Sequence, residues 1–294
     1  DRPRCGAARA WGCLRLKKAK LESYILDADL LLAGVLDVGR IDLHIDRDLF
    51  LTDEQTWRFE DFIERRSRYE PVDYVLGHRE FMGLDFRVDP RVLVPRPSTE
   101  LMVERALEFV GMDVGLGREL RPDSQYDPLV VDIGTGCGAA AISIAHFLPS
   151  ARVIASDIST PAVVVARENV IAHDVAGTVN VVVADMQPAT KSRPDLLVAN
   201  LPYIPTGEIR HMQRDVREFE PHVALDGGPD GFALHRRLIH AAEVGPGGAM
   251  LLEIGYEQAD FVRSAASLRS ADLAVEVFPD LIGLDRVALI TGWS

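Results

Sequence analysis

From residue 128 to its end, the sequence alternates short apolar runs with longer segments of helical pattern. This alternation is typical of an α/β fold, in which helices cover both faces of a mainly parallel sheet. Ligands bind such sheets at the carboxyl ends of the strands, so the residues after each strand are candidates for a functional site. The predicted strands are 129–132, 152–156, 179–183, 196–199, 249–253, 273–277 and 285–291, and the predicted helices are 139–147, 161–173, 232–244 and 257–269.

The first part of the chain has a different pattern, which predicts a small helical bundle. Apolar spacing indicates a helix over 7–20, and Ser23 and Asp27 are start signals before the apolar run 28–33. Thr52 and Gln55 form a capping-box pattern that predicts a further helix. This region carries no recognisable catalytic constellation, so we expect it to recognise a substrate.

The segment between the two halves predicts a β-hairpin and a stiff connection. Residues 79–88 alternate around a central glycine, which indicates a hairpin. Two prolines follow, and we expect Ser98 and Thr99 to cap a helix over 100–110. The predicted organisation is a helical domain over 1–78, a hairpin linker over 79–98 and an α/β domain over 99–294, with a loop over 111–127.

Composition excludes several classes of function. A hydrophobic content of 47% supports buried cores, and a net charge of −13 argues against broad binding to a nucleic-acid backbone. The three cysteines, Cys5, Cys13 and Cys137, form no C-x-x-C pair, so we expect reduced thiols and a cytoplasmic location. No apolar run reaches the length of a membrane span, and no histidine spacing predicts a metal site.

The first predicted strand of the α/β domain leads into a glycine-rich loop, Gly134-Thr135-Gly136-Cys137-Gly138, and then into a helix. Alternate glycines let the backbone pass close to a ligand and turn sharply. Asp157 ends the next strand, where a carboxylate can accept both hydroxyls of a ribose. No further glycine is spaced for a pyrophosphate, so a nucleoside such as S-adenosylmethionine fits better than a dinucleotide. The residues expected to flank its adenine are Asp185 and Met186.

A second candidate site follows the buried run 196–199, where the chain reads Asn200-Leu201-Pro202-Tyr203. Pro202 ends the strand and biases Leu201 toward an extended backbone. The Asn200 side-chain oxygen and a neighbouring carbonyl are two acceptors that can hold both hydrogens of a planar NH2 group. Tyr203 can stack on the same plane. This turn therefore predicts a site that aims an amide or amino nitrogen at an electrophile.

Together, the glycine loop, Asp157 and the turn resemble class I S-adenosylmethionine-dependent methyltransferases. That resemblance implies a Rossmann-like domain with a mostly parallel seven-stranded sheet. From about residue 25 onward, further segments are similar to the HemK/PrmC family. These segments are Arg79-Glu80-Phe81, Leu93-Val94-Pro95-Arg96-Pro97-Ser98-Thr99-Glu100, Glu220-Pro221-His222-Val223-Ala224-Leu225-Asp226-Gly227-Gly228-Pro229-Asp230-Gly231 and Leu252-Glu253-Ile254-Gly255-Tyr256.

The resemblance implies a protein-glutamine methyltransferase that acts on the Gly-Gly-Gln loop of class I peptide chain release factors. It implies that the glycine loop lines the methionine part of S-adenosyl-L-methionine, that Asp157 binds the ribose, and that the turn holds the glutamine. S-adenosyl-L-homocysteine is then the product. The sequence departs from the family at Leu201, where a proline is usual, and at Met186, where an aromatic residue is frequent.

Three alternatives stay open from the sequence. One is a glutamine methyltransferase acting on a large-subunit ribosomal protein, which shares the turn and the hairpin. Another is a DNA adenine amino-methyltransferase, which the acidic composition disfavours. The third is a non-catalytic binding protein with a degenerate cofactor pocket, which the intact glycine loop disfavours.

Overall fold

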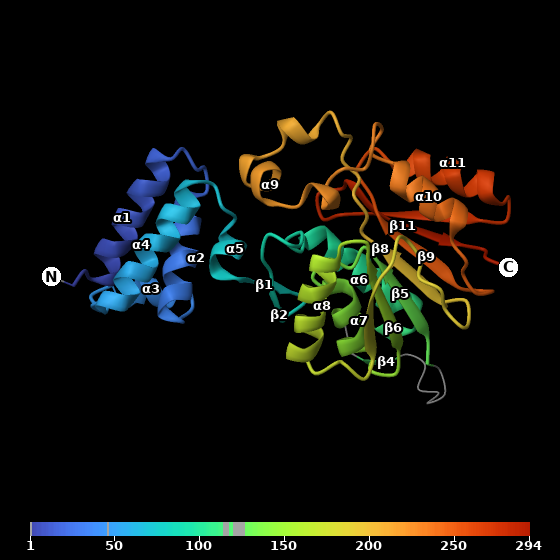
Figure 1. Ribbon diagram of the computed structural model, residues 1–294, viewed down its shortest axis with the longest axis horizontal. Coiled ribbons are helices and arrows are strands. Elements are labelled where there is room, and N and C mark those ends of the chain that lie inside the picture. The colour runs from blue at the N-terminus through green and yellow to red at the C-terminus, as the bar shows by residue number, and fades with distance from the viewer. Residues whose placement is uncertain (1, 46, 114–117, 120–126) are drawn as a thin grey trace. The chain divides into compact units, whose positions relative to one another are not determined.

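The structure is a computed structural model that describes residues 2–45, 47–113, 118–119 and 127–294. It divides into two compact units, Asp1–His78 with Gln213–Phe219, and Arg79–Met212 with Glu220–Ser294. The first unit is built from helices, and the second contains a large sheet with its flanking helices (Figure 1).

The smaller unit confirms the predicted helices and adds a segment from later in the chain. Helices α1, α2 and α4 pack against one another around an apolar core that includes Leu31, Leu32 and Phe59. Gly12 of α1 permits this approach, because a β-carbon there would lie 2.8 Å from the Phe59 ring. The helices are α1 (Cys5–Lys18), α2 (Tyr24–Leu36), α3 (Asp42–Ile45), α4 (Asp53–Ser67), α5 (Val72–Leu76) and α9 (Arg214–Phe219).

Helix α4 begins with the predicted capping box. The Thr52 hydroxyl accepts the Gln55 backbone N–H at 3.1 Å, and the Gln55 side chain accepts the Thr52 N–H at 2.9 Å. Two orphan donors of the first turn are thereby satisfied. Ser23 precedes α2, as predicted, but its hydroxyl donates to the Asp27 carboxylate at 2.9 Å instead of capping the backbone.

A buried ion pair links three segments of the smaller unit. The Arg66 guanidinium donates to Asp27 at 2.7 Å and to Asp215 of α9 at 3.3 Å. It also donates to the Glu70 carbonyl at 3.1 Å. Arg66 and Asp27 are both buried, so these bonds compensate for the loss of hydration at two charges. The pairing explains why a helix from residues 214–219 belongs to this unit.

The predicted hairpin is present as β1 (His78–Phe81) and β2 (Leu84–Arg87). At its tip, Met82 and Gly83 both have positive φ, 53° and 75°. Two consecutive positive φ values match the twist of a tight hairpin. The Met82 N–H donates to the Glu100 carboxylate at 2.9 Å, which compensates for the strained backbone of a non-glycine residue.

Helix α6 (Pro97–Phe109) begins earlier than predicted. Proline suits the first helical position, where its missing N–H has no partner to lose. Ser98 and Thr99 therefore lie inside the first turn, and their hydroxyls donate to the carboxylate of Glu253 at 2.9 Å and 2.6 Å. The prediction that these two residues cap the helix is wrong, because their hydroxyls donate hydrogen bonds to a buried carboxylate and no side chain caps the helix.

The predicted loop over 111–127 contains a short antiparallel pair, β3 (Met112–Asp113) with β4 (Arg118–Glu119). Residues 114–117 and 120–126 of this stretch lie outside the described residues.

The larger unit contains a seven-stranded sheet of order β10-β11-β9-β8-β5-β6-β7, which confirms the predicted fold class. Strands β5 to β9 run parallel where they pair, and β11 pairs antiparallel with both of its neighbours. The chain moves outward from β5 to β7 and then returns to the other side of β5 as β8. The strands are β5 (Leu129–Ile133), β6 (Arg152–Asp157), β7 (Val179–Val183), β8 (Leu196–Ala199), β9 (Ala249–Glu253), β10 (Ala274–Pro279) and β11 (Asp285–Thr291).

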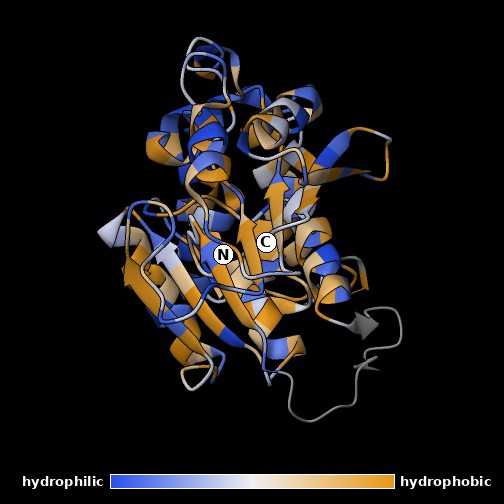
Figure 2. Cartoon of the chain, turned by 90° about the vertical axis from the view of Figure 1, so that its right-hand side faces the viewer, coloured by the Kyte–Doolittle hydropathy of each residue, from blue (hydrophilic) through white to orange (hydrophobic). Residues whose placement is uncertain are grey.

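The central strands are buried on both faces, as their continuous apolar sequences predict, and Figure 2 shows them as predominantly hydrophobic. On one face, Val131 and Leu197 pack with Leu238 and Val262 of α10 and α11. Helices α6, α7 and α8 contact each other in turn and cover the opposite face (Figure 1). None of the helices in the described part of the chain has the length and apolarity that crossing a bilayer requires. The helices are α7 (Ala139–Phe147), α8 (Thr160–Ala172), α10 (Ala233–Ala241) and α11 (Ala259–Arg269).

The region between β8 and α10 contains short helices that the sequence did not predict. They are η1 (Ile209–His211), α9 and η2 (His222–Ala224). Each is too short to show a helical period in the sequence. Helix α10 also ends earlier than predicted, at Ala241, because Ala242 already has an extended backbone with ψ of 141°.

Candidate functional site

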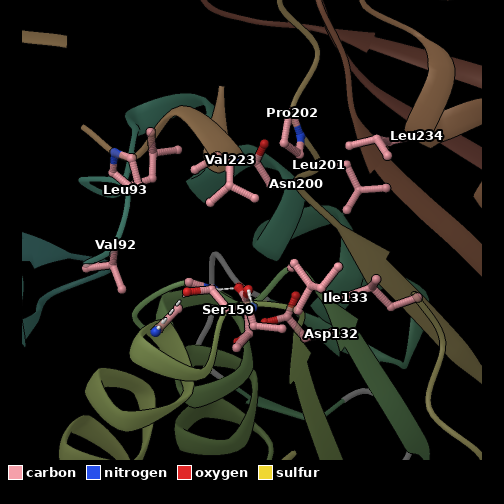
Figure 3. A pocket seen from close by; sticks show the side chains of 18 of the residues that line it. Val92, Leu93, Asp132, Ile133, Ser159, Asn200, Leu201, Pro202, Val223 and Leu234 are labelled. Atoms are coloured by element: carbon pink, nitrogen blue, oxygen red, sulfur yellow. Dashed lines mark hydrogen bonds between the residues drawn. The ribbon is translucent and has the colours of Figure 1, made fainter. Parts of the chain in front are cut away.

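A large cavity of the α/β unit lies at the carboxyl ends of β5 and β8, where the strand order reverses. Its volume is about 610 Å³. Such a switch point is where ligands bind in open α/β sheets. Figure 3 shows Asp132, Ile133 and Ser159 on one side of the cavity, and Asn200 with its neighbours on another. The fold thus brings the glycine loop and the Asn-Leu-Pro-Tyr turn to one cavity.

The glycine loop is held in a tight backbone conformation at the end of β5. Gly134, Gly136 and Gly138 have φ values of 73°, 57° and 89°, which other residues rarely adopt. The N–H groups of Gly134 and Thr135 donate to the Ser156 carbonyl at 2.8 Å and 2.9 Å. The loop therefore exposes backbone to the cavity without side chains in the way.

Asp157 connects this loop to the next strand. Its carboxylate accepts the Gly136 N–H at 2.9 Å and the Ser159 N–H at 2.8 Å. Burial raises the pKa of this carboxyl, although the bonds to the two backbone N–H groups lower it. Each carboxylate oxygen has a second lone-pair direction, so the group can accept further hydrogen bonds from a ligand in the cavity. That Asp157 binds a ribose stays a prediction.

Asp132 is a lining residue that the sequence analysis did not single out. It lies in β5, is fully buried, and accepts the Thr135 hydroxyl at 2.6 Å. Burial raises the pKa of Asp132 to about 6. The signal for it was its place near the end of a buried strand, immediately before the glycine loop.

Asp185 and Met186 both line the cavity beyond the end of β7. The Asp185 carboxylate is exposed and paired with Arg237 of α10, at 2.7 Å and 3.0 Å. Met186 adopts a positive φ of 66°, and its carbonyl accepts the Ser156 hydroxyl at 3.4 Å. These two residues therefore contribute an ion pair and an apolar side chain to one wall.

The turn after β8 presents Asn200, Leu201 and Pro202 to the cavity. Leu201 is buried and packs against the glycine loop. The approach is close, since a β-carbon added at Gly134 would lie 3.1 Å from the Leu201 side chain. Tyr203 lines a smaller neighbouring cavity of about 80 Å³, together with the other three residues of the turn. Its hydroxyl lies 3.3 Å from the Glu253 carboxylate, to which it donates.

The turn and the residue after it, Ile204, are held by the glycine-rich segment 225–231. The Ile204 N–H donates to the Leu225 carbonyl at 3.2 Å, and the Gly227 N–H donates to the Ile204 carbonyl at 2.9 Å. Gly227 must lack a side chain, because a β-carbon would lie 2.7 Å from the Pro202 carbonyl. Gln258 donates to the Tyr203 carbonyl at 3.1 Å. This glycine-rich segment therefore supports the turn from behind.

Ten of the twelve predicted site residues line the large cavity; Gly138 and Tyr203 do not. Gly138 lies at the start of α7, where a β-carbon would lie 2.9 Å from Ile142, so its role is in loop-to-helix packing. The predicted lining residues are Gly134, Thr135, Gly136, Cys137, Asp157, Asp185, Met186, Asn200, Leu201 and Pro202, and among those not predicted are Val92, Leu93, Thr99, Asp132, Ser159 and Val223.

Solved structures and family models agree with this fold. The hMettl16 catalytic domain in complex with MAT2A 3'UTR hairpin 6 matches with a TM-score of 0.55 and 13% identity, covering 83% of each chain. The delta-N METTL16 MTase domain matches with a TM-score of 0.52 and 15% identity, covering 74% of this chain and 92% of that one. A family model described as "Methyltransferase small domain" matches residues 119–216. The fold and the matched domain are those of a class I methyltransferase.

Full-length relatives narrow the class to one family. A release factor glutamine methyltransferase from Moorella thermoacetica is 40% identical over 278 residues, with 94% of each chain covered. Relatives of the same name are 40% identical over 284 residues in Bradyrhizobium diazoefficiens (95% and 92% covered) and 38% identical over 269 residues in Neisseria gonorrhoeae (90% and 92% covered). The PrmC N-terminal domain model matches residues 7–77. The chain belongs to the release factor glutamine methyltransferase family.

Proposed function

We propose that this protein methylates the side-chain amide nitrogen of the glutamine in the Gly-Gly-Gln motif of class I peptide chain release factors, using S-adenosyl-L-methionine. The observation that carries the proposal is the position of Asn200 beside the glycine loop, across the boundary between β8 and β5. An amide-gripping turn and a nucleoside-binding loop then face one cavity. The names of the full-length relatives support the same substrate.

The residues of the cavity fit a nucleoside cofactor without phosphates. Gly134 and Gly136, both with positive φ, line the cavity with bare backbone, and Asp157 supplies a carboxylate beside them. No arginine or lysine belongs to the glycine loop itself, which suits an uncharged ribose better than a phosphate group. The bound cofactor supplies a methyl group on a positively charged sulfur, which is the electrophile. Gly134 to Cys137 would hold its methionine part, and Asp185 and Met186 would flank its adenine.

Asn200 and Leu201 would hold the substrate amide. The Asn200 side-chain oxygen accepts one N–H and the Leu201 carbonyl accepts the other, so the nitrogen lone pair points out of the amide plane. Tyr203 and Pro202 shape the surroundings of this amide. The amide nitrogen would attack the methyl carbon in line, so that an N–C bond forms as the C–S bond breaks and S-adenosyl-L-homocysteine leaves. No covalent enzyme intermediate is needed, and the surplus proton would pass from the nitrogen to water. The contribution of the enzyme is mainly orientation, which is worth up to about 7–11 kcal/mol in favourable cases.

The helical domain over 1–78 would recognise the release factor, joined through the hairpin linker over 79–98 to the methyltransferase domain over 99–294. Removing residues 1–75 should spare cofactor binding and lower the rate on the whole release factor, since remote contacts contribute to transition-state binding. A normal rate for the truncated enzyme on the whole protein would exclude this role.

The proposal is tested by a methyl-transfer assay with labelled S-adenosyl-L-methionine on purified class I release factor, large-subunit ribosomal protein and DNA in parallel. Label should appear in the release factor only, and should disappear when the glutamine of Gly-Gly-Gln is replaced. Label in the ribosomal protein or DNA alone would identify one of the other methyltransferases. Cofactor binding without transfer to any substrate would indicate a binding protein.

A further inference from the structure

Three hydroxyl groups converge on one buried carboxylate behind the turn. Glu253 is the last residue of β9 and is fully buried. Its side chain accepts the hydroxyls of Ser98 at 2.9 Å and Thr99 at 2.6 Å, both from the first turn of α6. It also accepts the hydroxyl of Tyr203 at 3.3 Å. Two sequence segments noted above, around Ser98-Thr99 and around Glu253, therefore meet here.

Thr99 connects this carboxylate to Asn200. The Asn200 side-chain nitrogen donates to the Thr99 hydroxyl oxygen at 2.9 Å. A hydroxyl has one proton and two lone pairs, whereas an ionised carboxylate only accepts. The short bond to Glu253 uses the Thr99 proton, so Thr99 offers Asn200 a lone pair and nothing else. The Asn200 NH2 group must therefore face Thr99, which leaves its oxygen for the cavity.

We propose that Thr99 and Glu253 are positioning residues that fix the orientation of the Asn200 amide, and thereby make the site selective for an NH2 group over an oxygen acid. This inference rests on the proposed function, in which Asn200 holds the substrate glutamine. The relay runs Asn200 to Thr99 to Glu253, and each member determines the direction of the next bond.

The selectivity follows from what each orientation of Asn200 presents. In the observed orientation, the substrate meets an acceptor oxygen beside the Leu201 carbonyl, which is also an acceptor. A glutamine NH2 group donates one hydrogen bond to each of these two acceptors. A glutamate carboxylate has no proton to donate, so the Asn200 oxygen and the Leu201 carbonyl are left without a donor. If Asn200 turned over, its NH2 would donate to a carboxylate, and the distinction would be lost.

The reverse orientation is disfavoured by the same buried network. It would place the Asn200 oxygen against the Thr99 oxygen while the Thr99 proton stays with Glu253, and an acceptor facing an acceptor in a buried site is costly. Thr99 and Glu253 are both buried, which limits the water that can relieve the mismatch. Burial raises the pKa of the Glu253 carboxyl, whereas the hydroxyl donors Thr99, Ser98 and Tyr203 and the positive charge of Arg286 favour its charged form.

The test compares Thr99→Val, Thr99→Ser and Ser98→Ala by their rates and by their selectivity. Val has the shape of Thr without the hydroxyl, Ser keeps the hydroxyl, and Ser98→Ala removes a different hydroxyl from Glu253 without touching Asn200. Selectivity is read as the inhibition constant of a release factor carrying Gly-Gly-Glu divided by KM for the normal Gly-Gly-Gln protein. Cofactor affinity is measured by calorimetry as a control.

Thr99→Val should lower kcat about 10-fold, since the acceptor of the amide loses its fixed aim. It should also reduce the selectivity ratio about 10-fold, because the freed Asn200 can donate to a carboxylate. Thr99→Ser should restore both values, and Ser98→Ala should leave the ratio unchanged. An unchanged ratio in Thr99→Val, or an equal loss in Ser98→Ala, would overturn the proposal. Thr99→Ala replaces Thr99→Val if circular dichroism shows the latter unfolded.

Asn200→Asp supplies an independent arm, since an aspartate presents an acceptor to the cavity whichever way it turns. Adding Thr99→Val to Asn200→Asp should then have no further effect on the ratio, and a further loss of selectivity would contradict the relay. Failure of the parent enzyme to methylate the release factor would contradict the proposed function itself. Normal parental activity with a Thr99-independent ratio would contradict the relay alone.

Discussion

The carboxylate of Asp157 accepts the backbone N–H of Gly136 at 2.9 Å, across 21 positions of sequence. One acid at the end of β6 thereby fixes the middle of the glycine loop that follows β5. Through this bond Asp157 holds the glycine loop in place, in addition to its predicted contact with a ribose. Substitutions of Asp157 therefore have to distinguish the effect on the loop from the effect on the ribose contact.

Asp157→Ala should weaken binding of S-adenosyl-L-methionine by about 1.5–3 kcal/mol, because buried hydroxyls lose a charged acceptor. Asp157→Asn is the comparison variant: its one oxygen can still accept the Gly136 N–H without the charge, while its NH2 group loses the bond from the Ser159 N–H. Isothermal titration calorimetry measures both. Equal affinity in the alanine variant and the parent would show that Asp157 is not the ribose ligand.

Gly227→Ala should disturb the turn from behind. A β-carbon at Gly227 would lie 2.6 Å from the Gly231 carbonyl and 2.7 Å from the Pro202 carbonyl, so the backbone of one segment has to move. We expect a stability loss of about 1–3 kcal/mol and a lower kcat with nearly normal cofactor affinity. Gly207→Ala is the control, because a β-carbon there meets nothing within 4 Å. Equal kinetics for the two variants would show that the turn does not depend on this support.

His235 should make the folded state sensitive to mild acid. Its Nε2 donates to the Glu253 carbonyl at 2.9 Å, and its Nδ1 has no hydrogen-bond partner among the described residues. Burial lowers the pKa of His235 from 6.5 to about 4. The unfolded chain therefore takes up a proton first as pH falls, so stability is full above pH 6.5 and declines toward pH 4.

The expected decline from His235 is roughly 3 kcal/mol between these two pH values. Urea unfolding of the parent and of His235→Gln at a series of pH values measures it. The difference in stability between the two proteins should shrink or reverse in sign as pH falls. Parallel curves for the parent and His235→Gln would contradict the assignment.

The sequence predicted those residues of the site that lie in a turn directly after a buried strand. Leu196 to Ala199 reads as a buried strand, and Asn200 follows it whatever the rest of the chain does. The same holds for the glycine loop after β5. Local pattern and the general rule about strand ends were sufficient for both.

The parts that the sequence did not predict depend on which distant segments meet. Thr99 and Glu253 are 154 positions apart, and no local pattern indicates that they share a hydrogen bond. Local reasoning made Thr99 a helix cap, since threonine favours that position. In the structure the Thr99 hydroxyl instead donates to the Glu253 carboxylate, because a buried carboxylate needs hydrogen-bond donors.

If Asn200 and Leu201 hold the substrate amide as proposed, the methylation rate of Asn200→Ala on class I release factor at saturating S-adenosyl-L-methionine should reveal it. Losing one preorganised hydrogen bond at the reacting group should lower kcat about 10²–10³-fold. Leu201→Pro, which keeps the carbonyl, should retain a nearly normal rate. A parental rate in Asn200→Ala, or a larger loss in Leu201→Pro than in Asn200→Ala, would contradict the account.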